Sequence, residues 1–144
     1  MSSQKSFYPL ATRPFMTVPR VGSFHPSPDA TKALDGLMRV IRRAEGIGLL
    51  VGPTGTGKSL LLSCLRERIE GDYAVALLSG ARICTRRGLW QSILSDLGEA
   101  YRGLDEEELR IGLVDRIRGL AATGSGLVVL VDESHTLPRR LLEE

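Results

Sequence analysis

The sequence predicts an α/β protein built around a parallel sheet. Two short and almost wholly apolar runs, at residues 73–78 and 127–131, have the composition of strands that are buried on both faces. Stretches in which apolar residues recur at helical spacing alternate with these runs, as expected when helices connect parallel strands. The 144 residues are 42% hydrophobic and 25% charged, which is typical of one globular domain and excludes a disordered or collagen-like chain.

Charge, cysteines and hydropathy exclude several other classes of protein. The formal net charge of +2 does not by itself indicate nucleic-acid binding. Cys64 and Cys84 lack the spacing of a disulfide framework or a zinc site. No apolar run approaches the ~20 residues of a membrane span, and the N-terminus lacks the apolar segment of a secretory signal. We therefore expect a cytoplasmic protein.

The first half of the chain divides at about residue 26. Four prolines within residues 1–26 predict an extended leader or linker. Ser27 followed by a proline predicts the start of a helix, whose apolar spacing continues until Gly46. Residues 48–51 then predict a short buried strand, and residues 58–69 predict a second helix.

The second half continues the same alternation. The strand predicted at 73–78 is followed by a helix with Thr85 as its cap. Asp105 and Glu108 form a close variant of the capping box and predict a further helix, which runs to about residue 122. The chain then reaches the strand predicted at 127–131.

Residues 52–59, GPTGTGKS, match the phosphate-binding pattern GxxxxGK[ST] at every fixed position, between a predicted strand and a predicted helix. Gly55 and Gly57 permit the backbone angles with which N–H groups surround a phosphate, and the following helix adds its positive N-terminus. Lys58 supplies charge to the β- and γ-phosphates, and the Ser59 hydroxyl is suited to Mg²⁺. The predicted nucleotide-binding residues are Gly52, Pro53, Thr54, Gly55, Thr56, Gly57, Lys58, Ser59 and Leu60.

Two acidic residues, Asp132 and Glu133, follow the apolar run 127–131 directly. Such a strand delivers its acids to the carboxyl edge of a parallel sheet, where ligands bind. We expect Ser59 and Asp132 to hold Mg²⁺, and Glu133 to orient or deprotonate the water that attacks ATP. Glu133 and Lys58 are thus the predicted catalytic residues, and ATP and Mg²⁺ the predicted cofactors.

The segments GPTGTGKS, LVVLVDESH and LPRRLLEE resemble the AAA+ ATPases. With FHPSPDATKALDGLMRVIRRAEGIGLLVGPTGTGKS, the resemblance narrows to the general secretion pathway protein A (ExeA-like) group and its relatives in DNA transposition, over about residues 14–144. It implies the three-layer α/β/α P-loop NTPase fold and ATP hydrolysis coupled to remodelling of a protein or DNA-associated complex. For the full-length protein it implies a homo-oligomer, a secretion-apparatus or transposition partner, and association with the inner membrane as an option.

The resemblance also implies parts that these residues do not contain. They are an arginine finger, a sensor 2 element, a helical lid, and a sensor 1 strand between the strands predicted at 48–51 and 127–131. We therefore interpret residues 27–144 as the N-terminal portion of an AAA+ domain. Without the intervening strand, the two flanking strands would have unpaired edges or would pair with each other. We expect the isolated chain to be marginally stable or aggregation-prone, and to bind nucleotide better than it hydrolyses it.

Two alternative functions remain open at this point. Residues 132–135, DESH, have the form of the box that defines DExH-box helicases, although the Pro-Thr-x-x-Leu type of element is missing after residue 78. The chain could also be a nucleotide-gated binding module in which ATP acts only as an assembly switch. Substitution of Glu133 by Gln distinguishes turnover from switching.

Overall fold

A two-stranded parallel sheet forms the centre of the computed structural model, which describes residues 21–79 and 83–141. Strand β1 (Ala74–Leu78) lies beside β2 (Leu127–Val131), with Ala74 opposite Leu127 and Leu78 opposite Val131. Both strands occur where the sequence predicts them, and their parallel pairing is confirmed.

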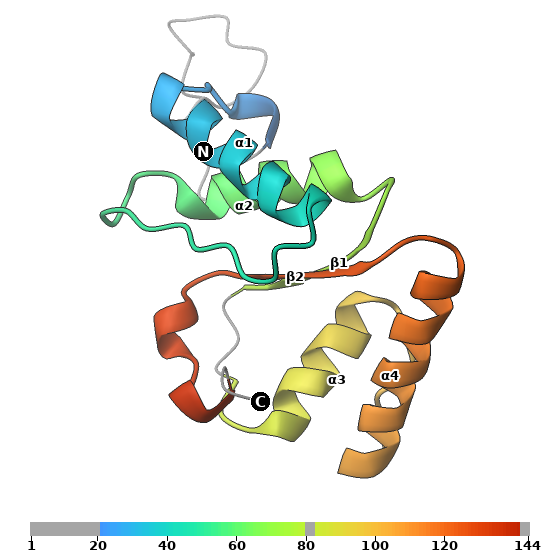
Figure 1. The fold of residues 1–144 in the computed structure, drawn as a ribbon. Coiled ribbons are helices and arrows are strands. Elements are labelled where there is room, and N and C mark those ends of the chain that lie inside the picture. The colour runs from blue at the N-terminus through green and yellow to red at the C-terminus, as the bar shows by residue number, and fades with distance from the viewer. Residues whose placement is uncertain (1–20, 80–82, 142–144) are drawn as a thin grey trace, which may run out of the picture.

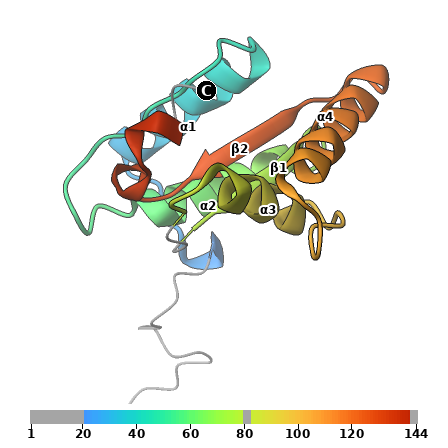
Figure 2. The ribbon, with the colours of Figure 1, turned by 90° about the horizontal axis from the view of Figure 1, so that it is seen from below.

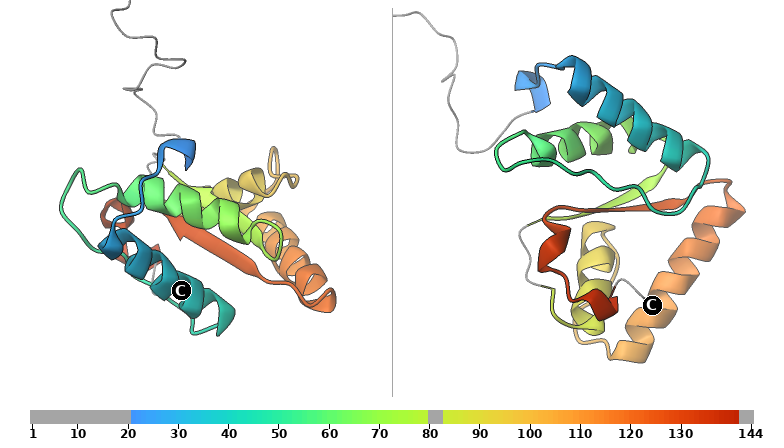
Figure 3. Two further views of the ribbon diagram at one scale, coloured as in Figure 1. Left: turned by 90° about the horizontal axis from the view of Figure 1, so that it is seen from above. Right: turned by 60° about the vertical axis from the view of Figure 1, so that its left-hand side comes forward.

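Helices cover both faces of this sheet and give three layers. On one face lie α1 (Pro28–Arg42) and α2 (Lys58–Ile69), and on the other lie α3 (Arg86–Asp96) and α4 (Glu106–Ala122), as Figures 1 and 3 show. Three short 3-10 turns complete the described elements: η1 (Val21–Ser23), η2 (Ser134–Thr136) and η3 (Arg139–Leu141). None of the described helices is long and apolar enough to cross a membrane.

Each face of the sheet has its own hydrophobic core. The core beneath α1 and α2 consists of Leu34, Leu61, Leu65, Ile69, Val75 and Leu130. The core beneath α3 consists of Ala76, Leu78, Ile83, Ile93 and Leu137. Neighbouring residues of each strand contribute to opposite cores, because successive side chains of a strand point to opposite faces. The sheet is therefore buried on both sides, as its apolar composition predicts.

Side-chain caps start three of the helices where the sequence predicts them. Ser27 Oγ accepts a hydrogen bond from the Ala30 N–H at 3.2 Å, and Thr85 Oγ1 begins α3 in the same way. At the start of α4, Asp105 and Glu108 form both bonds of the capping box, at 2.8 and 2.7 Å. Each cap provides an acceptor for a backbone N–H that the helix leaves unpaired.

The leader prediction for residues 1–26 lies mostly outside the described residues. Of that segment the structure describes only residues 21–26, which begin with the 3-10 turn η1. The next prediction, that the first helix reaches Gly46, is wrong by one turn. Helix α1 ends at Arg42, and Ala44 adopts a left-handed φ of 50°, which takes the backbone out of the helix.

The strand predicted at residues 48–51 does not form, and this prediction is wrong. Residues 47–53 are extended but belong to neither a helix nor a strand. Leu50 packs against the core beneath α1 and α2, whereas Leu49 and Val51 are 75% and 80% exposed. A strand requires backbone hydrogen bonds to a neighbouring strand, and no described segment provides them here. An apolar run predicts burial but does not supply that partner.

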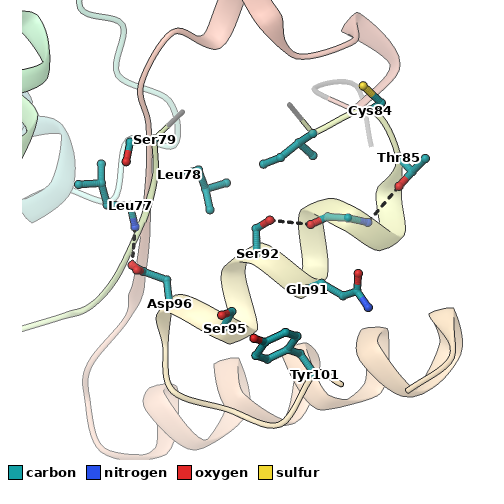
Figure 4. Close-up of a pocket in the computed structure, with 12 residues that line it drawn as sticks. Leu77, Leu78, Ser79, Cys84, Thr85, Gln91, Ser92, Ser95, Asp96 and Tyr101 are labelled. Carbon is teal, nitrogen blue, oxygen red and sulfur yellow. Dashed lines mark hydrogen bonds between the residues drawn. The ribbon is translucent and has the colours of Figure 1, made fainter. Parts of the chain in front are cut away.

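The two outer edges of the sheet differ. On the β1 side, the Leu77 N–H donates to Asp96 Oδ2 at 2.7 Å, a bond drawn in Figure 4. Arg66 of α2 lies 3.5 Å from the same carboxylate. On the β2 side, no described strand pairs with the outer edge, and Val129 is 38% exposed. A side chain thus protects one edge, and the other edge remains open.

Candidate functional site

The glycine-rich loop, residues 52–57, leads directly into helix α2. Gly55 and Gly57 have φ angles of 82° and 83°, in the left-handed region that glycine adopts without strain. Gly57 is the N-cap residue of α2 and has no side chain to accept a hydrogen bond. The first N–H groups of α2 therefore have no side-chain acceptor from the cap, and this arrangement suits an anion.

Lys58 lies inside the bend that the loop makes. Its Nζ donates to the carbonyl oxygens of Gly52 and Pro53 at 2.9 and 2.7 Å, and the side chain is half-buried. Thr56 Oγ1 donates to the same Pro53 carbonyl at 2.8 Å. These bonds fix the position of the ammonium group relative to the loop backbone. A positive charge is thus held beside N–H groups that could receive phosphate oxygens.

The first turn of α2 presents Ser59 and Leu60. Ser59 is exposed, and its carbonyl accepts from Ser63 Oγ at 3.0 Å, which leaves the Ser59 hydroxyl outside that bond. Leu60 is half-buried. One turn further, burial raises the pKa of the Cys64 thiol, so Cys64 acts as a neutral packing residue.

The two acids lie where the chain leaves β2. The Asp132 N–H donates to the Leu78 carbonyl at 3.0 Å and extends the parallel pairing by one bond. Asp132 Oδ1 accepts from the Glu133 N–H at 3.0 Å. The Asp132 side chain is half-buried, and Glu133 is exposed. The strand therefore ends with one carboxylate engaged by the backbone and one directed to solvent.

Glu133 has a backbone conformation that is unusual for a residue with a side chain. Its φ and ψ are 53° and 44°, in the left-handed region. Its carbonyl oxygen accepts from both the N–H and the Oγ1 of Thr136, each at 2.9 Å. Such strained positions cluster at functional sites. Thr136 is a residue that the sequence analysis missed, because nothing in the local pattern signals this contact.

The glycine loop and the two acids face the same end of the molecule. Both strands run toward that end, and the loop lies beside it in Figures 1, 2 and 3. Among the described residues no hydrogen bond or ion pair joins Lys58 or Ser59 to Asp132 or Glu133. The sequence-predicted residues thus share an edge of the sheet without contacting one another.

The available donors fit a magnesium ion that is shared with a nucleotide. Mg²⁺ favours oxygen ligands and often keeps several waters, with one or two protein ligands plus phosphate oxygens. The described part of the chain contains no group of three or more His, Cys, Asp or Glu side chains that could hold a metal alone. A hydroxyl from Ser59 and a carboxylate from Asp132 match the smaller donor set.

A separate hollow of about 550 Å³ lies beside β1 and α3 (Figure 4). It contains none of the predicted nucleotide-site residues, and its polar groups are largely engaged within the protein. Thr85 caps α3, Ser92 Oγ donates to the Gly88 carbonyl, and Asp96 accepts from Leu77. We assign no ligand to it.

Comparison with known proteins agrees with this geometry. The family model described as AAA domain matches residues 41–144. The chain is 28% identical over 139 residues to general secretion pathway protein A of Aeromonas hydrophila, covering 96% of this chain and 25% of that protein. It is 35% identical over 68 residues to phosphonates import ATP-binding protein PhnC of Nitratidesulfovibrio vulgaris, covering 47% and 23% of the two chains. No solved structure matches.

These matches cover most of the present chain but little of its relatives. The chain spans about a quarter of the length of the curated proteins it matches. The family match includes the glycine loop, both strands and the two acids. The three-layer architecture agrees with the N-terminal part of a P-loop NTPase domain. The chain therefore belongs to the AAA domain family, as an AAA+ P-loop ATPase of the type found in general secretion pathway protein A.

Proposed function

We propose that residues 52–60 bind MgATP and that this site, with Asp132 and Glu133, hydrolyses it. The observation that carries the proposal is the complete GxxxxGK[ST] loop, with its lysine held inside the bend at the start of α2. Membership of the AAA domain family supports nucleotide binding. It also favours this function over that of a DExH-box helicase.

Phosphate binding would rest on backbone groups and one side chain. The N–H groups of the loop and of the first turn of α2 would surround the phosphates, aided by the positive end of the helix. Lys58 would exchange its two bonds to backbone carbonyls for bonds to phosphate oxygens. Because Lys58 already lies within the bend, this exchange requires little rearrangement of its charge.

The metal would be held by Ser59 and Asp132. When bound, Mg²⁺ neutralises the charge that develops on the phosphates. For Asp132 to take part, its carboxylate needs an oxygen lone pair beyond the one that accepts from Glu133. A carboxylate has about four such positions, so the bond to Glu133 leaves this capacity.

Glu133 would act on the attacking water. Its carboxylate is exposed at the edge where the phosphates would lie, and its backbone is fixed by Asp132 on one side and Thr136 on the other. In this role the carboxylate accepts a hydrogen bond from the water, aligns it with the γ-phosphate and takes up its proton.

At the level of the whole protein, we propose that hydrolysis drives remodelling of a protein or DNA-associated complex by a homo-oligomer located in the cytoplasm or at the inner membrane. The match to a protein named for general secretion supports a secretion-apparatus partner. A transposition complex with DNA is the second candidate. These proposals extend beyond the quarter of that relative's length that the chain spans.

The test of nucleotide binding is Lys58→Ala, measured by isothermal titration calorimetry with MgATP. We expect heat of binding to disappear. The control is Lys32→Ala, an exposed lysine of α1 with the same charge change, which should leave the affinity unchanged. Equal affinities for the wild type and Lys58→Ala would reject the assigned site.

The test of catalysis is Glu133→Gln. If the chain is an enzyme, this variant should retain MgATP affinity and lose phosphate release in a single-turnover assay. If ATP serves only as a switch, the wild type and the variant should both bind ATP and release no phosphate. Wild-type release that survives the substitution would remove Glu133 from the mechanism.

A further inference from the structure

A second hollow, distant from the glycine loop, is lined almost entirely by arginines. It lies between the C-terminal ends of α1 and α2 and has a volume of about 550 Å³. Its lining residues are Asp35, Met38, Arg39, Arg42, Arg43 and Arg68. Both helices end on the same side of the molecule, opposite to the glycine loop (Figure 1). Lys58 and Arg68 are separated by ten helical residues, or about 15 Å.

The charge of this hollow is unbalanced. Four guanidinium groups face one carboxylate, a local excess of +3, whereas the whole chain carries only +2. Arg43 lies 3.4 Å from Glu45 in an exposed ion pair. For the side chains of Arg39, Arg42 and Arg68, the described residues supply no hydrogen-bond or ion-pair partner. Three positive side chains are therefore available to an external anion.

Helix stability explains only part of this arrangement. Basic residues in the last turn of a helix interact favourably with its negative end, and this effect applies to Arg39 and Arg42 on α1 and to Arg68 on α2. It acts on each helix separately. It does not require the two ends to meet around one hollow, where like charges repel one another. A bound polyanion would remove that repulsion.

The composition of the lining favours one class of partner. Protein–protein interfaces are centred on apolar or aromatic anchors, and here Met38 is the only apolar lining residue. Single-stranded nucleic acids bind through bases stacked on aromatic rings, and no aromatic residue lines the hollow. Guanidinium groups pair in a bidentate way with phosphate. We propose that this arginine hollow binds the phosphate backbone of duplex nucleic acid, without reading its sequence, at a site separate from the nucleotide loop.

The proposal predicts a defined salt dependence. The probe is a fluorescein-labelled 30-base-pair DNA duplex, titrated with the 144-residue chain and followed by fluorescence anisotropy at several salt concentrations. Neutralisation of three phosphates gives a slope of about −2.7 for log K against log salt, or about a 40-fold loss of affinity between 50 and 200 mM. Absence of duplex binding at 50 mM salt would overturn the proposal.

Matched variants separate the hollow from general charge. Combined substitution of Arg39, Arg42 and Arg68 by Ala should weaken duplex binding by more than tenfold and bring the slope close to zero. The control replaces Arg102, Arg110 and Arg118 by Ala, with the same loss of three charges on the other side of the sheet. It should change the affinity by less than threefold. Equal losses in the two triple variants would overturn the proposal.

Further measurements keep the outcome decisive. Substitution of the three hollow arginines by Lys should preserve the slope, and Arg42→Ala alone should reduce it by about 0.9. This single variant replaces the triple variant if the latter fails to fold. Stronger binding to polyglutamate or to phosphatidylglycerol vesicles than to the duplex would assign the hollow to another partner. Lys58→Ala should leave duplex binding intact, so failure of the nucleotide site is distinguishable.

Discussion

The two edges of the central sheet use opposite solutions to the same problem. Along β1, a carboxylate from α3 accepts the Leu77 N–H, and Arg66 of the helix that follows the glycine loop lies beside that carboxylate. Along β2 no side chain of the described residues performs this function, and the nearby segment 47–51 exposes Ile47, Leu49 and Val51. An edge closed by a side chain is a boundary of the sheet. An open edge beside exposed apolar residues is suited to pairing.

The largest expected effect contrasts two adjacent positions on the open strand. Leu130 is 7% exposed and belongs to the core beneath α1 and α2, whereas Val129 is 38% exposed. Leu130→Ala should lower the free energy of unfolding by about 2–5 kcal/mol because it leaves a cavity. Val129→Ala should lower it by less than about 1 kcal/mol. Urea unfolding followed by circular dichroism measures both, and similar losses would show that the two side chains are equally buried.

Removal of the protected edge should have an intermediate effect. Asp96→Ala deprives the Leu77 N–H of its acceptor and Arg66 of a partner, so unfolding should become easier by about 1–3 kcal/mol. Light scattering should also increase faster on concentration, because the β1 edge would become as open as that of β2. Asp96→Asn keeps an oxygen acceptor and should lose less stability. If Asp96→Ala has wild-type stability and scattering, the bond to Leu77 does not protect the edge.

The smallest effect on stability is expected from a charge placed on the open strand. Val129→Lys should change the free energy of unfolding by less than about 0.5 kcal/mol, since the side chain reaches water. It should nevertheless slow aggregation, because lysine disfavours edge-to-edge pairing. Ile117→Lys, at a comparably exposed position on α4, is the control and should have no such effect. Equal behaviour of the two variants would indicate that general solubility, and not the edge, controls aggregation.

Local chemistry made most of the helices predictable. Ser27, Thr85 and the pair Asp105 and Glu108 determine where α1, α3 and α4 begin, and each acts through bonds to residues no more than three positions away. The two strands were predictable because their apolar runs require burial on both faces. The glycine loop was predictable because its glycines, Lys58 and Ser59 are contiguous.

Features that depend on distant partners were not predictable in the same way. The strand expected at 48–51 failed because pairing requires a second strand, which a local apolar run cannot guarantee. The bond between Asp96 and Leu77 spans 19 positions, and nothing around Asp96 signals it. The arginine hollow likewise requires α1 and α2 to end side by side. The expected aggregation tendency of the isolated chain stays a prediction.

The left-handed corner at Glu133 has a consequence for how the site could vary. Glycine would adopt this backbone without strain, whereas glutamate pays on the order of 1 kcal/mol for it. The fold therefore tolerates a local loss of stability in order to display a carboxylate at the end of β2. Thr136 anchors that corner through two bonds to one carbonyl, so exchanging it for valine would redirect the acid without altering its chemistry. The reach of the carboxylate is thus governed by a neighbour that touches neither nucleotide nor metal.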